Sequence, residues 1–304
     1  MRSSRLILFA AFVAPALVQA ASPLVGHWDF NMPGANRACW LGISEKGGTL
    51  DVWYQPTGGN VFEVKDVKSS GGHLSLTLSR PNAQTATTWE LDAKGDQLKG
   101  VQKHGDQTIE LTGVRAPELK HAPPKSWAKA KPLFDGKDLA GWEPIGDPAN
   151  SHWIVKDGLL INEAHGANLK TTAKFEDFNL HFEVNCPDGA NSGFYLRGRY
   201  EVQLEYEKTK EPPERSMGAI YGRIGPKMEM PRKPGKWETF DVTLVGRTVT
   251  IVRDGVLTVD RKEIEGITGG ALDANEGEPG PFYIQGDHTG GLQFRNITVS
   301  VAQR

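Results

Sequence analysis

The segment from Asn191 to Glu207 constrains the fold more than any other stretch, because apolar and polar residues alternate along it almost without a break. Its even positions from 194 to 206 are apolar or aromatic except at Gly198, and its odd positions from 197 onward are arginines, glutamates and a glutamine. A period of two predicts β-strand with one buried face. The polar face is either a surface that meets water, as in many antiparallel sheets, or the wall of a binding cleft.

Short alternating segments of the same kind fill most of the chain, and helical periodicity is scarce. They include "TLDVWYQ", "HLSLTLS" and "TTWELDA" in the first part, and "FNLHFEVNC" and "ETFDVTLVGRTVTIVRDGVLTVD" in the second. The pairs Asp157-Gly158 and Asp254-Gly255 are typical of tight hairpin turns. We therefore expect an all-β protein, in which a small antiparallel barrel-like domain precedes a two-sheet jelly-roll sandwich.

The chain divides into four predicted regions. Arg2 and Arg5, an apolar run and a small-residue site ending at Ala20 are typical of a secretory leader. Between Arg115 and Pro132 the sequence is rich in Pro, Lys and Ala without sustained periodicity, which indicates a linker. The predicted regions are a signal peptide over 1–20, a small all-β domain over 21–116, a linker over 117–131 and a jelly-roll domain over 132–304.

Composition and targeting narrow the classes of function. Because the leader predicts export and nothing after it approaches the roughly 18 apolar residues of a membrane span, we expect a periplasmic or secreted protein without membrane insertion. The formal net charge of −2 does not favour a nucleic-acid partner. Cys39 and Cys186 are the only cysteines, so neither a disulfide framework nor a structural zinc site is indicated. No nucleotide cofactor is expected.

Eight landmarks occur in an order that resembles the 3-keto-disaccharide hydrolase family over residues 131–302. They are "LFDGKDLAGW", "WIVKDGLL", "FEDFNLHFEV", "NSGFYLRGRYEVQLEY", "GAIYG", "PGKWETFDV", "VRDGVLTVD" and "GPFYIQGDHTGGLQFRNI". The resemblance implies a concanavalin-like jelly roll whose sugar site lies on the concave sheet. It also implies a hydrolase or lyase acting on 3-keto-glycosides or 3-keto-disaccharides. Glu238 departs from the family pattern, which more often has Asn there.

A second resemblance concerns the first domain. That domain begins with "LVGHWDF" and ends with "LTGVR", a pattern similar to lipocalin-like barrels that open on Gly-x-Trp and close on Arg. Its role is left open between glycan binding and support of its neighbour.

The substrate implied by the resemblance requires particular chemistry. A ketone at C3 acidifies the proton on C2, and loss of that proton lets the C1 aglycone leave by β-elimination before water adds back. Such a site needs a base near C2, a group that stabilises the enolate at the C3 oxygen, and an acid for the leaving oxygen. We expect catalytic roles for Glu201, Glu205 and Arg197 on the alternating segment, and for His288 in "QGDHTGG". Glu201 and His288 are the two candidates for the base.

Four further residues are candidates for binding the oligosaccharide or glycoside substrate. Gln203 lies between the two glutamates, Gln285 lies just before His288, and an aromatic contact from Tyr221 in "GAIYG" would suit a sugar. In the last strand the apolar phase changes, which predicts a β-bulge near Arg295-Asn296. Arg295 would then either point into the cleft or form a structural ion pair. A divalent cation could polarise the C3 oxygen, although no ligand spacing is diagnostic.

Two other functions remain open from the residues alone. One is a non-catalytic carbohydrate-binding protein, since lectin-like folds present similar faces. The other is a retaining glucanase in which Glu201 and Glu205 act as nucleophile and acid/base, which requires carboxyl groups about 5 to 5.5 Å apart. For the 3-keto reading, an upstream 3-dehydrogenase would have to supply the ketone.

Overall fold

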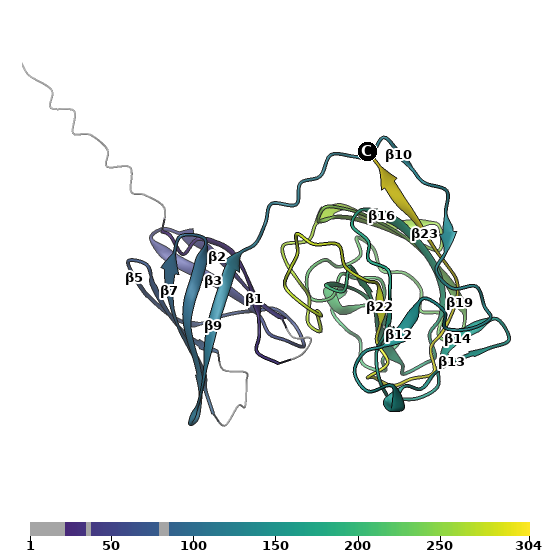
Figure 1. The fold of residues 1–304 in the computed structure, drawn as a ribbon, viewed down its shortest axis with the longest axis horizontal. Helices are drawn as coiled ribbons and strands as arrows, with labels where there is room; N and C mark the ends of the chain where they lie inside the picture. Colours follow the sequence, from purple (N-terminus) through teal and green to yellow (C-terminus); the bar gives the residue numbers. More distant parts are fainter. Residues whose placement is uncertain (1–21, 35–37, 79–84) are drawn as a thin grey trace, which may run out of the picture.

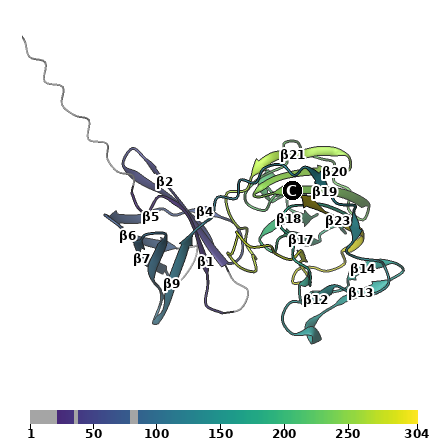
Figure 2. The same cartoon turned by 45° about the horizontal axis from the view of Figure 1, so that its top comes forward.

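Strands make up nearly all of the regular secondary structure in the described part of the chain, whose helices are two short 3-10 turns (Figure 1). The computed structural model describes residues 22–34, 38–78 and 85–304, so the predicted leader over 1–20 lies outside it. Two units lie side by side, one from the purple to blue strands and one from the teal to yellow strands, and a second view agrees (Figure 2). Within the described residues, no helix is long and apolar enough to cross a membrane.

The N-terminal unit is an antiparallel sheet, called here the N-terminal sheet. Its strand order is β4-β3-β2-β1-β9-β8-β7-β6-β5, so the first and last strands of the unit pair at its centre. The strands are β1 Gly26–Asn31, β2 Ala38–Lys46, β3 Thr49–Gln55, β4 Phe62–Glu63, β5 Asp66–Ser70, β6 His73–Leu78, β7 Thr87–Lys94, β8 Gln97–His104 and β9 Gln107–Arg115.

Trp28 and Arg115 meet where β1 pairs with β9. The guanidinium carbon of Arg115 lies 4.2 Å from the centre of the Trp28 ring, a cation–π contact. Nη1 of Arg115 also donates to the Val25 carbonyl at 3.0 Å. A Cβ at Gly26 would lie 2.3 Å from that Nη1, so glycine is needed for the close approach. The Gly-x-Trp opening and the closing arginine seen in the sequence therefore form one cluster.

The C-terminal unit is a sandwich of two sheets. The larger, called the large sheet, has the order β13-β14-β23-β16-β19-β20-β21, with β10 and β11 also paired to β23. Its strands are β10 Ser126–Trp127, β11 Lys131–Pro132, β13 Trp153–Lys156, β14 Leu159–Asn162, β16 Phe178–Asn185, β19 Trp237–Val245, β20 Thr248–Arg253, β21 Val256–Glu263 and β23 Gln293–Gln303. The segment predicted as a linker thus contains β10 and the start of β11, and the predicted domain boundaries stay predictions.

The second sheet of the sandwich, called the small sheet, has the order β12-β15-β22-β17-β18. Its strands are β12 Trp142–Pro144, β15 Leu169–Thr171, β17 Asn191–Leu196, β18 Tyr200–Glu205 and β22 Tyr283–Ile284. Two short 3-10 helices, η1 Pro148–Asn150 and η2 Pro213–Arg215, interrupt the loops. The predicted all-β fold with a C-terminal two-sheet sandwich is confirmed.

The hairpin turns and the β-bulge predicted from the sequence are present in the sandwich. Asp157 and Asp254 adopt φ of 53° and 48° and are each followed by a glycine with positive φ, as a two-residue hairpin turn requires. In β23, the pairing with β16 shifts register beside Arg295, and Asn296 has φ of 52°. The predicted hairpins and the predicted β-bulge are therefore confirmed.

Stacked phenylalanines join the two sheets of the sandwich. Phe182 on β16 lies between Phe240 on β19, at 5.0 Å between ring centroids, and Phe194 of the small sheet, at 4.5 Å. All three side chains are fully buried. Stacks of this kind add to the free energy of burial and fix the sheets relative to each other.

Trp40 on β2 packs the N-terminal sheet against the sandwich. Its side chain is buried and belongs to the hydrophobic core of the sandwich. A Cβ at Gly266 would lie 2.3 Å from Nε1 of Trp40, so the chain passes directly against the indole. The amide of Gly270 donates to the Thr57 carbonyl at 2.9 Å. The N-terminal sheet therefore contacts residues 264–272, a loop called here the bracing loop.

We expect Phe182→Ala to lower the free energy of unfolding of the sandwich by roughly 3–5 kcal/mol, because it removes the middle ring of a packed stack. Val301→Ala is the matched control, since Val301 is 42% exposed and its replacement should change stability by less than about 0.5 kcal/mol. Urea unfolding followed by hydrogen exchange would resolve the sandwich from the N-terminal sheet. A loss below about 1 kcal/mol for Phe182→Ala would contradict this packing.

Candidate functional site

The polar face of β18 is covered rather than solvated. Glu201, Gln203 and Glu205 lie on one face of the strand, and they are only 3%, 3% and 4% exposed. Val202 and Leu204 alternate with them and belong to the sandwich core. The interpretation of this face as an ordinary water-facing surface therefore does not hold. Figure 2 shows β17 and β18 adjacent within the sandwich.

Glu201 is the most deeply placed carboxyl group of this face. Its Oε2 lies 2.8 Å from the hydroxyl oxygen of Tyr195, the residue opposite it on β17. Its Oε1 lies over the backbone of Gly193, where a Cβ would be only 2.2 Å away. Gly193 is therefore the residue that leaves room for the carboxyl group to lie flat on the sheet.

The Tyr195 hydroxyl group has one proton to donate, and two acceptors compete for it if Glu201 is ionised. Its oxygen lies 2.8 Å from Glu201 Oε2 and 2.7 Å from the Gly269 carbonyl, and it accepts from Nε2 of Gln285 at 3.0 Å. A carbonyl only accepts, so Tyr195 can donate to Gly269 and still meet Glu201 only if Glu201 carries a proton. Burial and, to a smaller extent, the charge of Asp287 raise the pKa of Glu201 to about 8 against a hydrogen bond from Tyr195 that lowers it.

Two buried amide oxygens beside Glu201 have no partner among the described residues. Gln203 donates through Nε2 to the side-chain oxygen of Asn191 at 3.3 Å, but its own Oε1 accepts nothing. The Oε1 of Gln285 is in the same position. Buried acceptors without a donor are costly, by roughly 1–3 kcal/mol each. Both oxygens would be satisfied by ligand hydroxyl groups.

Tyr221 and His288 are less buried than Glu201. The amide of Tyr221 donates to the Glu201 carbonyl at 3.0 Å, and burial together with the Glu201 charge raises the pKa of its phenol. Nδ1 of His288 lies 2.9 Å from Asp287. Burial opposes ionisation of Asp287, yet the hydrogen bond and charge of His288 lower its pKa overall. Tyr221 and, through Tyr195, Gln285 therefore lie near Glu201, and His288 contacts Asp287, whose charge acts on Glu201.

Glu205 stands at the edge of this face and opens onto a cavity of about 690 Å³. Its carboxylate oxygens accept from the amides of Glu207 at 2.7 Å and Met217 at 3.2 Å. Burial nevertheless raises the pKa of Glu205. Glu201 and Glu205 are held from opposite sides of β18, because Tyr195 belongs to β17 and Met217 lies beyond the other edge of the strand.

The prediction that Arg197 points into the same cleft is wrong. Its guanidinium is buried and donates to the carbonyls of Gly246, at 3.3 Å, Glu276 and Glu278. Arg197 follows the last residue of β17 and has φ of 54° in the hairpin before β18. The strand alternation that would have aimed it toward Glu201 ends before it.

Arg295 is also placed away from Glu201. Its Nε donates to Glu183 at 2.7 Å, and its guanidinium lies 4.1 Å from the centre of the Trp237 ring. These partners belong to β16 and β19 of the large sheet, so the bulge turns Arg295 to that sheet's outer surface. Of the two interpretations offered for Arg295, the structural ion pair is the one observed.

Three features of the site escaped the sequence interpretation. Tyr195 and Tyr283, whose rings stack at 3.9 Å between centroids, form the floor beside Glu201. The alternation could have found Tyr195, because it shares the parity of Glu201. Arg215, whose charge partly opposes the rise in the pKa of Tyr221 that burial and Glu201 cause, and the bracing loop carry no periodic signal.

Glu238, which departs from the family pattern, lies inside the sandwich. Its carboxylate accepts from Nε of Arg253 at 2.8 Å and from the hydroxyl of Tyr206 at 2.5 Å. The residue is therefore engaged in a buried ion pair and does not lie on the polar face. Among residues 22–34, 38–78 and 85–304, no three His, Cys, Asp or Glu side chains are grouped so as to hold a metal ion.

A β-sandwich whose small sheet carries recessed carboxyl, amide and phenol groups has the shape of many carbohydrate-active proteins, and the family match below places the chain in the glycosyl-hydrolase-like class. Residues 129–300 match the 3-keto-alpha-glucoside-1,2-lyase-like domain, and the chain belongs to this family. The resemblance seen in the sequence is thereby confirmed.

One solved structure supports this fold. A candidate glycosyl hydrolase from Parabacteroides distasonis is 28% identical, with a TM-score of 0.51 over 60% of this chain and 93% of that one. A second candidate glycosyl hydrolase from the same organism is 19% identical, with a TM-score of 0.49 over 57% of this chain and 94% of that one. No curated protein matches the chain.

We expect Glu201→Gln to stabilise the protein at alkaline pH. A folded-state pKa of about 8 against an ordinary value of 4.5 means that the folded state holds a proton that the unfolded chain releases, so stability falls as pH rises through this window. The amide carries no charge, and its advantage over wild type should grow by on the order of 3 kcal/mol between about pH 5 and about pH 8.

Thermal or urea unfolding at the two pH values measures this difference. Glu263→Gln on β21 is the matched control, because Glu263 is exposed and the same substitution there should give no comparable growth. A constant difference between Glu201→Gln and wild type across this range would contradict a neutral Glu201.

Proposed function

We propose that the chain cleaves 3-keto-glycosides at the polar face of the small sheet by removing the C2 proton and eliminating the C1 aglycone. The observation that carries this proposal is Glu201, a carboxyl group buried against Tyr195 with one oxygen lying over Gly193. The family match supports it, because the matched domain is described as 3-keto-alpha-glucoside-1,2-lyase-like. Water then adds to the unsaturated 3-keto product, and the net reaction is hydrolysis.

Glu201 is the proposed base. A general base works best when its pKa lies near the operating pH, and burial brings the pKa of Glu201 to about 8. At neutral pH about a tenth of the molecules carry the ionised form, which is a much stronger base than an ordinary glutamate. The electron pair of the broken C2–H bond moves into an enolate on the C3 oxygen, and then expels the C1 oxygen.

Other groups have supporting roles in this proposal. The unpartnered oxygens of Gln203 and Gln285 would accept from sugar hydroxyls. Tyr221 and His288, at the rim, are the groups that would donate to the C3 oxygen as charge develops there. Glu205, whose pKa burial also raises, would protonate the leaving oxygen.

The retaining-glycosidase mechanism has less support. It needs two carboxyl groups about 5 to 5.5 Å apart across one carbon atom. Glu201 and Glu205 are four residues apart on one strand, roughly 13 Å between Cα atoms at about 3.3 Å per residue. Their carboxyl groups are held by partners on opposite sides of β18.

We further propose that the protein acts after export, in the periplasm or outside the cell, since its first twenty residues have the features of a secretory leader. Its substrate carries a ketone where ordinary glycosides carry a hydroxyl group. A dehydrogenase that oxidises C3 must therefore act before it.

Turnover of a 3-keto-glucoside in heavy water should place deuterium at C2 of the product faster than the free ketone exchanges. Glu201→Gln should suppress both label and cleavage by roughly 10²–10⁴-fold, the usual contribution of a general base. Wild-type kcat/KM should rise as pH increases toward about 8, because the ionised form of Glu201 is the active one. Nuclear magnetic resonance of the product measures the label.

His288→Gln tests the second candidate for the base. If His288 only donates to the C3 oxygen, its loss should slow turnover while leaving deuterium at C2 coupled to each cleavage event. Cleavage without any enzyme-dependent deuterium at C2 would overturn elimination and favour direct displacement.

A further inference from the structure

Beside Glu205 lies a cavity to which the proposed reaction at the polar face assigns no role. Its volume of about 690 Å³ is within the range of small-molecule sites. Three of the five methionines in the chain line it, namely Met217, Met228 and Met230. Methionine suits binding sites of adaptable shape, and its sulfur makes favourable contacts with aromatic rings. A lining of this kind fits an apolar aromatic ligand better than a second sugar ring.

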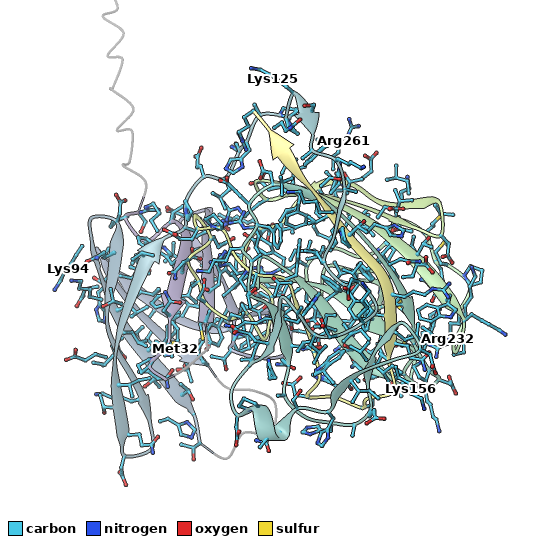
Figure 3. The ribbon with its side chains drawn as sticks, turned by 45° about the vertical axis from the view of Figure 1, so that its right-hand side comes forward. Met32, Lys94, Lys125, Lys156, Arg232 and Arg261 are labelled. Atoms are coloured by element: carbon cyan, nitrogen blue, oxygen red, sulfur yellow. The ribbon has the colours of Figure 1, made fainter. Side chains whose placement is uncertain are left out.

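Four of the charged side chains that line the cavity form two ion pairs with each other. Lys210 lies 3.2 Å from the carboxylate of Glu229, and Arg232 lies 3.6 Å from that of Asp188. Arg232, labelled in Figure 3, lies at the surface of the sandwich and marks the outer rim of the cavity. The lining has four acidic and four basic side chains, so the cavity has no formal net charge that would favour an ionic ligand.

Glu205 connects this cavity to the polar face. Its carboxylate lines the cavity and also accepts from the amide of Met217, which lines it too. Along β18 it follows Gln203 and Glu201 on the same face. A sugar bound over Glu201 would therefore have its C1 substituent directed past Glu205 toward the methionines.

From these contacts we infer that the cavity is the aglycone subsite and that it takes phenolic aglycones. The inference rests on the proposed function. When the C1–O bond breaks, the oxygen keeps the bonding electron pair and receives a proton from Glu205, so a neutral phenol leaves into the cavity. The C1–C2 double bond of the sugar forms from the electrons of the C2–H bond, and no oxidant or reductant is needed.

Binding is tested without turnover by labelling the methionine methyl groups with ¹³C and titrating the full protein with 4-methoxyphenol. The methyl signals of Met217, Met228 and Met230 should shift and saturate. The signal of Met32, in the N-terminal unit, is the internal control and should stay in place. Glucose is the ligand control and should shift none of the three. Unchanged cavity signals, or an equal shift of Met32, would overturn the inference.

Specificity is tested by comparing an aryl 3-keto-glucoside with a 3-keto-disaccharide. Met228 is 45% exposed, so Met228→Ala should fold normally, and combining it with Met230→Ala should lower kcat/KM for the aryl substrate by about tenfold or more. The disaccharide should be affected far less. Met32→Ala is the matched control variant and should change neither substrate. An equal loss for both substrates would contradict an aromatic aglycone subsite.

The two proposals fail in different ways. Saturable methyl shifts with no turnover of either keto substrate would reject the proposed function and still support the cavity as a phenol site. Turnover without methyl shifts, and with unchanged aryl preference in the double variant, would reject the cavity assignment and leave the proposed function standing.

Discussion

The contact between the Glu201 carboxyl group and the Tyr195 hydroxyl group is the interaction on which the site depends. It requires glycine at position 193, because any Cβ there would occupy the place of Oε1. It also requires the Gly269 carbonyl, which lies 2.7 Å from the same hydroxyl. Burial makes ionisation of this carboxyl group costly, and that cost is what turns an ordinary glutamate into a group with a pKa of about 8. The folded protein thus loses stability at the group for which we propose the role of base.

The N-terminal sheet contributes to this arrangement through the bracing loop. In this loop, the Gly269 carbonyl accepts a hydrogen bond from the Tyr195 hydroxyl and the Gly270 carbonyl accepts one from the Tyr283 hydroxyl. The amide of Gly270 also donates to the Thr57 carbonyl of the N-terminal unit. Glycine at position 270 is needed, since a Cβ there would lie 2.5 Å from the Tyr195 oxygen. The sequence left two roles open for the N-terminal unit, glycan binding and support of its neighbour. These contacts favour support.

Alternation along the strands was enough to predict most of the fold and part of the site. The period of two placed Glu201, Gln203 and Glu205 on one face, and turn residues located the hairpins. It failed at Arg197, because parity has meaning only while the backbone is extended, and this residue adopts φ of 54° beyond the end of β17. It failed for Arg295 for another reason. A change of phase in the apolar positions predicts a bulge. The direction in which Arg295 points, however, depends on which strands pair with β23, and those strands are far away in the sequence.

Long-range packing supplied what local pattern could not. The bracing loop has no periodicity, yet its carbonyls determine the proton balance around Tyr195. The sequence left open whether the polar face of β18 meets water or lines a cleft, and the burial of this face is the cause of the shifted pKa of Glu201. Asp29 shows the same effect at the contact between the units, where burial and the nearby charge of Glu276 raise its pKa to about 9. The sequence thus identified the ionisable groups, whereas burial in the folded structure determines their pKa values.

The most direct test of this account is a ¹³C nuclear magnetic resonance titration of the protein with its glutamate carboxyl carbons labelled, with the signal of Glu201 assigned from its absence in Glu201→Gln. The account predicts that this signal titrates at about pH 8, well above the ordinary glutamate value of 4.5. Titration of Glu201 near that ordinary value would contradict the account, because the carboxyl group would then be neither neutral at rest nor a strong base.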